Sequence, residues 1–266
     1  MQSTIQGRPG PDLHRTTARV VGVLFLAAFF AYGGGSAVLA SVLDAPNYLS
    51  NLAANTGQLR IGALLMLVNS LVVAAIGVLM LRIARPHGEV IAFGYLGARL
   101  VEAVVLAVGV VFLLLQIPLA REAADVGAAG AAALPILSEL STQGNFYAYQ
   151  VAMIALGLGS LPFWYLFYRS GLVPRFLAAW GIVGYGIFAT GAVLEILGLE
   201  VGLILSVPAG LFEASLGIWL MVKGFSSPVA APRTAPPQRR WRWRHDCAGI
   251  AGAVRGAAHD RLPREA

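Results

Sequence analysis

Apolar residues along this chain gather into six long runs that are separated by short polar segments. Each run has about 20 residues or more, the length at which an α-helix crosses the roughly 30 Å hydrocarbon core of a bilayer. We expect membrane-spanning helices over residues 20–43, 61–81, 90–117, 146–168, 176–199 and 201–222. The sequence therefore predicts an all-α protein, a six-transmembrane-helix bundle whose main contact is the lipid bilayer.

The segments that join the runs on one side of the predicted bundle have a pattern of their own. Residues 47–58 and 135–140 mix leucine and aromatic residues with polar ones, which favours short helices at the membrane surface. Residues 120–133 are rich in alanine and glycine, and we expect a loop there.

Composition sharpens the class of protein and the division of the chain. Hydrophobic residues make up 58% of the sequence and charged residues only 12%, whereas soluble domains have roughly a quarter charged residues. A water-soluble protein is therefore excluded. We divide the chain into an N-terminal tail, 1–18, a transmembrane domain, 19–225, and a basic tail rich in proline and alanine, 226–266, which we expect to be disordered.

The positive charges predict the orientation of the bundle. An even number of spans puts both termini on one side, and 16 of the 19 lysine and arginine residues then fall on that side. Arg60 and Arg121 fall on the opposite side, and Arg99 lies within a span. By the positive-inside rule, both termini are expected in the cytoplasm.

Few charged residues lie at the depth of the hydrocarbon, where each costs about 2.5 to 3.5 kcal/mol at a helix centre. Arg99 and Glu102 are three residues apart on the third run, close enough to pair on one helix face. Glu213 lies in the middle of the sixth run and Glu195 near the end of the fifth. Asn69 on the second run is the expected neutral partner of this group. These five residues form the candidate polar site within the membrane.

Two interpretations of this group stay open at the level of sequence. In the functional one, Glu213 or Glu102 exchanges a proton and Arg99 is the fixed positive charge, in a protein that carries or binds a proton, an ion or a small amphiphile. In the structural one, the charges satisfy each other and only fix the register of the helices. The protein is then a membrane scaffold or a module that senses the bilayer.

A weak internal repeat bears on the first interpretation. Residues 98–103 and 209–214 agree at four of six positions, and each segment contains one of the two central glutamates. Two halves of three spans each would be inverted relative to one another, as in many secondary transporters. In a chain so rich in alanine and leucine, coincidence can produce the same agreement.

Motifs for catalysis or metal binding are missing from the predicted spans. All four histidines lie outside them, and the single cysteine, Cys247, lies in the C-terminal tail. We therefore expect no enzyme activity, no metal and no cofactor. Arginine alternates with tryptophan over 239–244, which is typical of contact with anionic lipid; an unstructured, solvated tail is the alternative, and nucleic acid is not expected as a partner.

Four stretches of the sequence together carry a family resemblance. They are the basic start of the first span at 15–30, the segment 97–107 with its Arg-Leu-Val-Glu, the turn YRSGLVPR at 168–175, and the ending at 213–224. In this order they resemble bacterial membrane proteins that are grouped as domain of unknown function 4386. The resemblance implies a six-span protein of the bacterial plasma membrane, implies no activity, and suggests that Arg99, Glu102 and Glu213 are family features.

The turn within that resemblance also has a simple physical reading. Gly171 is expected to end the fourth spanning helix and Pro174 to start the fifth. Arg169 and Arg175 are expected to anchor the turn among the cytoplasmic lipid headgroups.

Overall fold

Seven α-helices account for most of the residues that the structure, a computed structural model, describes: 11–43, 48–125 and 133–226. The helices are α1 (Pro11–Leu43), α2 (Tyr48–Ala54), α3 (Thr56–Ala84), α4 (Glu89–Asp125), α5 (Ala133–Ser170), α6 (Arg175–Ile196) and α7 (Gly202–Val222). Within these residues, every helix except the short α2 is long and apolar enough to cross a membrane. The prediction of an all-α bundle with six spans is confirmed.

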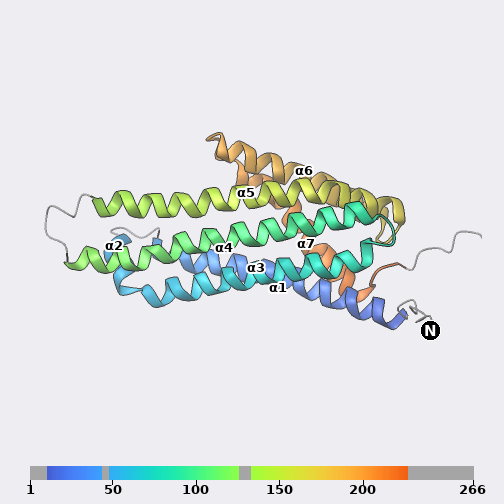
Figure 1. Cartoon of the computed structure of the whole chain (residues 1–266), viewed down its shortest axis with the longest axis horizontal. Coiled ribbons are helices and arrows are strands. Elements are labelled where there is room, and N and C mark those ends of the chain that lie inside the picture. The colour runs from blue at the N-terminus through green and yellow to red at the C-terminus, as the bar shows by residue number, and fades with distance from the viewer. Residues whose placement is uncertain (1–10, 44–47, 126–132, 227–266) are drawn as a thin grey trace, which may run out of the picture. The chain divides into compact units, whose positions relative to one another are not determined.

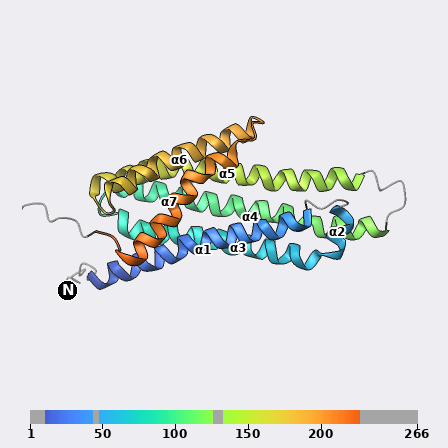
Figure 2. The ribbon, with the colours of Figure 1, turned by 180° about the vertical axis from the view of Figure 1, so that it is seen from behind.

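The six long helices follow one another around a closed circle in chain order. Each packs against the next one along the chain, and α7 returns to pack against α1 (Figures 1 and 2). Arginine and lysine residues lie at one end of the helix bundle, which we call the basic end: Arg19, Arg82, Arg169, Arg175 and Lys223. We call the other end, where α6 ends and α7 begins, the far end.

The outward faces of the helices are apolar. Leu71 is 73% exposed and Leu203 is 84% exposed, which would be unfavourable in water but suits contact with lipid chains. Between the helices, small residues permit close contact of the backbones, as expected where lipid removes the hydrophobic driving force for association. A Cβ atom added to Gly22 of α1 would lie 2.5 Å from the carbonyl oxygen of Gly217 on α7.

The far end of α4 and α5 differs from the prediction. Residues 135–140 are not a separate short helix but belong to the first turns of α5, and α4 extends into the expected loop over 120–133 as far as Asp125. The reason is a polar clamp between the two helices. The side-chain amide of Gln116 donates to the carbonyl oxygen of Ser138 at 2.9 Å and to Oγ1 of Thr142 at 3.0 Å, and the Ser138 hydroxyl donates back to Gln116.

The short helix expected over 47–58 is present as α2, which ends at Ala54 before α3 begins at Thr56. Its residue Leu52 is buried, and the side-chain amide of Asn51 donates to the carbonyl oxygen of Val42 at 2.8 Å. The segment is thus attached to the bundle by both polar and apolar contacts.

The turn between α5 and α6 forms as predicted. Gly171 has φ +68°, a conformation that favours glycine, and its amide bonds to the carbonyl oxygen of Phe167 at 3.1 Å. Pro174 directly precedes α6. Arg169 and Arg175 are exposed at the basic end, and their contact with headgroups stays a prediction.

The structure describes only a small part of the two predicted tails. Residues 1–10 and 227–266 lie outside the described residues, and so do residues 126–132 of the expected loop over 120–133. At the N-terminus, α1 begins at Pro11, so the helix includes the last eight residues of the expected tail, 11–18.

The contact between α1 and α7 gives a first testable prediction. Gly22→Ala should destabilise the protein by about 1 to 3 kcal/mol, because the added methyl group overlaps the backbone of α7. Gly97→Ala is the matched control, since nothing lies within 4 Å of a Cβ atom there, and it should be neutral or stabilising by up to about 1 kcal/mol. Thermal unfolding in detergent micelles measures both changes; equal destabilisation would contradict the packing of α1 on α7.

Candidate functional site

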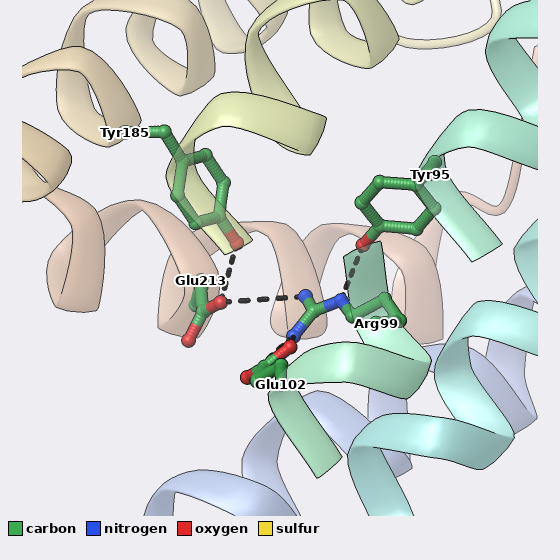
Figure 3. A network of polar contacts seen from close by, with 5 residues as sticks. All are labelled: Tyr95, Arg99, Glu102, Tyr185 and Glu213. Atoms are coloured by element: carbon green, nitrogen blue, oxygen red, sulfur yellow. Dashed lines mark hydrogen bonds and ion pairs between the residues drawn. The ribbon is translucent and has the colours of Figure 1, made fainter. Parts of the chain in front are cut away.

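Arg99 of α4 is the centre of a buried polar network (Figure 3). Its Nε donates to the hydroxyl of Tyr95 at 2.8 Å, and its Nη1 lies 3.2 and 2.9 Å from the two carboxylate oxygens of Glu102. All three residues are on α4, one turn apart, where side chains at i+3 and i+4 meet. The guanidinium carbon also lies 5.6 Å from the ring centre of Phe25 and 5.3 Å from that of Tyr95, within cation–π range.

The second carboxylate reaches the same guanidinium from α7. Glu213 Oε1 lies 3.6 Å from Arg99 Nη2, which is an ion pair but longer than a hydrogen bond. Nη2 is accordingly buried without a hydrogen-bond partner among the described residues. The hydroxyl of Tyr185, on α6, donates to the same Oε1 of Glu213. The other carboxylate oxygen of Glu213 points away from Arg99 (Figure 3).

The two glutamates therefore differ in their surroundings. The side chain of Glu102 is 3% exposed, whereas that of Glu213 is 22% exposed. The positive charge of Arg99 is already matched by the close pair with Glu102. If both carboxylates are ionised, these three residues carry one unmatched negative charge, and Glu213 is the more accessible place for it.

Room for Arg99 is provided by a glycine on the neighbouring helix. A Cβ atom on Gly77 of α3 would lie 2.8 Å from Cβ of Arg99. Any larger residue at this position would have to displace the start of the arginine side chain, so that Gly77 helps to fix where the guanidinium lies.

A cavity of about 200 Å³ opens beside these charges. Its lining comes from all six spanning helices and contains the charged residues Arg99, Glu102 and Glu213 together with Asn69. The rest of the wall consists of aliphatic and small residues together with six aromatic ones: Phe25, Phe29, Tyr32, Tyr149, Tyr185 and Phe188. Tyr32 of α1 and Tyr149 of α5 stack with their ring centres 5.2 Å apart, a contact between helices that are not neighbours in the circle.

Of the five residues of the candidate polar site, the structure brings four to this cavity. Asn69 is buried and lines it, but no hydrogen bond in the described part of the chain joins Asn69 to the charged residues. Glu195 lies elsewhere, near the far end of α6, where its carboxylate accepts from the backbone amide of Gly202 at 2.5 Å. There it satisfies one of the free amides at the start of α7.

Sequence reasoning missed the two tyrosines that hold the charges. Tyr95 could have been found, because it precedes Arg99 by four residues and thus lies on the same helix face. Tyr185 lies on another helix, and its only signal is a phenol in the middle of a span, whereas tyrosines of membrane proteins are enriched at the two interfaces.

No group of three or more histidine, cysteine, aspartate or glutamate side chains in the described segments could hold a metal ion. The site is instead an arginine with two carboxylates, two phenols and an aromatic cavity. Such a site can pair with a charged group or exchange a proton.

Six apolar helices around a buried charged site define the class: a multi-pass integral membrane protein. The chain belongs to the family described as domain of unknown function (DUF4386), whose sequence profile matches residues 20–224. This match includes α3, α4, α5, α6 and α7 in full, α1 from residue 20 onward, and every residue of the candidate site. Comparison with curated proteins and with solved structures gives no match.

The difference between the two glutamates gives the second prediction. Glu102→Gln should destabilise the protein by about 3 kcal/mol or more, because it leaves the buried charge of Arg99 without its close partner. Glu213→Gln should cost about 1 kcal/mol or less, because its contact with Arg99 is longer and partly exposed. Chemical or thermal unfolding in micelles measures both; equal losses would show that Arg99 depends on both carboxylates alike.

Proposed function

We propose that this protein binds, and carries across the membrane, a proton or another single positive charge at Glu213. The observation that carries the proposal is that Glu213 faces the cavity while Arg99 is already paired with Glu102. One extra negative charge at this depth is costly. A proton or a bound cation on Glu213 removes that cost, and the cavity gives either of them a place to arrive.

The location that we propose is the bacterial plasma membrane with both termini in the cytoplasm. The support is the charge at the basic end, where arginines and the lysine follow or precede the spans, against Arg60 and Arg121 near the far end. With this orientation, the cavity and Glu213 are reached from the half of the membrane away from the cytoplasm.

A purely structural role for the charges is the second candidate, and one observation favours it. All three side-chain hydrogen bonds of Arg99 among the described residues are made within α4, to Tyr95 and Glu102. An arginine whose hydrogen bonds are made within one helix can fix the register of the helices without any ligand. In this case the protein is a scaffold or a bilayer-sensing module.

Proton uptake distinguishes the two candidates. Purified protein is reconstituted into liposomes that enclose a pH-sensitive dye, and the external pH is lowered. The wild type should acidify the interior faster than protein-free liposomes, and Glu213→Gln should fall to the protein-free rate, because a glutamine cannot take up the proton. The matched control is Glu200→Gln, the same change at an exposed position between α6 and α7, which should behave as the wild type.

Equal uptake by the wild type and Glu213→Gln would reject Glu213 as the proton site. If neither protein exceeds the protein-free rate and both bind no proton in a direct titration, the structural role is the correct one.

A further inference from the structure

The cavity has one open and one closed side, and the packing of α1 against α7 decides which is which. Near the basic end the two helices touch, with the added Cβ of Gly22 only 2.5 Å from Gly217. Toward the far end they separate: a Cβ on Gly210 would have Phe29 as its nearest neighbour at 3.7 Å, and a Cβ on Gly33 would meet nothing within 4 Å. Figure 2 shows α7 crossing α1 and then diverging from it.

The residues at this separation also line the cavity. Phe29 and Gly33 of α1 and Ser206 and Gly210 of α7 all belong to its wall, and Phe29 is 50% exposed. Because α1 and α7 are spanning helices, the gap between them faces lipid chains. A molecule dissolved in the membrane can therefore reach the cavity from the side.

Toward the basic end, the cavity is closed by packed aromatic rings. Phe163, Trp164 and Phe212 are fully buried. The ring centres of Tyr95 and Phe163 are 3.7 Å apart, and those of Trp164 and Phe212 are 4.9 Å apart. Among the described residues, these packed rings separate the cavity from the basic end.

The chemistry of the wall favours a positive over a negative ligand. A ligand that enters the cavity meets Glu213 before Arg99, because the carboxylate is partly exposed and the arginine is buried behind it. Arg99 is occupied by Tyr95 and Glu102, whereas one oxygen of Glu213 points away from these partners (Figure 3). Phenyl and phenol rings also line the cavity, and the negative face of such a ring attracts a cation.

The volume limits the size of the ligand. A cavity of about 150 Å³ is known to hold benzene, and this one measures about 200 Å³. A single aromatic ring or a short alkyl chain with one charged group fits that space. The apolar body of such a ligand can pack against the aromatic rings of the wall while its charged group pairs with a charged side chain.

On the basis of the proposed function, we propose that the ligand of the cavity is a small amphiphilic monocation. The ligand is an organic ammonium with a compact apolar body that enters from the lipid between α1 and α7 and pairs with the free carboxylate oxygen of Glu213. The ammonium and a proton compete for this carboxylate, because either one neutralises the single unmatched charge.

Competition with a proton must be separated from the other titratable groups around Glu213. Those that line the cavity or bond to its charged residues come from four helices: Tyr32 on α1, Tyr95, Arg99 and Glu102 on α4, Tyr149 on α5 and Tyr185 on α6. Substitution of Glu213 alone identifies its share of any pH dependence, because all of these groups remain in place.

Three probes of one shape test the proposal: 2-phenylethylammonium, the neutral 2-phenylethanol and the anionic 3-phenylpropanoate. Binding is measured by titration calorimetry of the full chain in lipid nanodiscs. The ammonium should bind the wild type at least about tenfold more tightly than the alcohol, and the anion should bind no better than the alcohol. Lowering the pH should weaken the ammonium only, because a protonated Glu213 no longer pairs with it.

Two matched pairs of variants locate the binding. Glu213→Gln should remove the preference for the ammonium over the alcohol, and Glu200→Gln should retain it. Gly33→Leu should weaken both the ammonium and the alcohol by filling the entrance, whereas Gly34→Leu, the next residue of α1 and not part of the cavity wall, should not. The Gly33 pair keeps the test informative if Glu213→Gln does not fold.

Each other outcome overturns the proposal in a recognisable way. Equal binding of ammonium and alcohol, with proton uptake still lost in Glu213→Gln, leaves the proposed function standing and rejects the organic cation. Tighter binding of the anion assigns the cavity to Arg99 instead. If the wild type neither takes up protons nor binds the probes, both proposals are rejected.

Discussion

The pair between Arg99 and Glu102 is the interaction on which the rest of the site depends. It places a guanidinium in the centre of a bundle whose surroundings are hydrocarbon, with two bonds to a carboxylate on the same helix. An isolated arginine at this depth would be strongly unfavourable. Because the pair forms within α4, it needs no particular arrangement of the other helices, and these can then be organised around it.

The helices around Arg99 make the surroundings of its two carboxylate partners unequal. Glu213 and Tyr185 approach from α7 and α6, Gly77 of α3 leaves space for the arginine, and Phe25 of α1 lies against its face. The arginine is thus surrounded on every side but one. The remaining side is the cavity, which the second carboxylate, that of Glu213, also lines.

The sequence predicted the six spans because apolar runs of this length are typical of helices that cross a bilayer. It indicated Arg99, Glu102 and Glu213 as site residues because charged residues are rare inside a membrane. The sequence could not predict that residues 135–140 belong to the start of α5, because the clamp of Gln116 on Ser138 joins positions 22 residues apart. It also grouped Glu195 with the site, since depth alone cannot tell which helix face a residue occupies. Tyr185 and the aromatic cavity depend on the register between helices, which no local pattern records. The inverted repeat of the two halves stays one of two open interpretations beside coincidence; both of its glutamates flank Arg99.

We propose that the membrane interior holds one exchangeable carboxyl group, that of Glu213, beside the carboxylate of Glu102, which stays paired with Arg99. Infrared difference spectroscopy of the protein in lipid during a pH titration tests it most directly, because protonated carboxyl groups in apolar surroundings absorb apart from carboxylates. We expect one such band, which is absent in Glu213→Gln and present in Glu200→Gln. A band that persists in Glu213→Gln, or no band at any pH at which the protein stays folded, would contradict it.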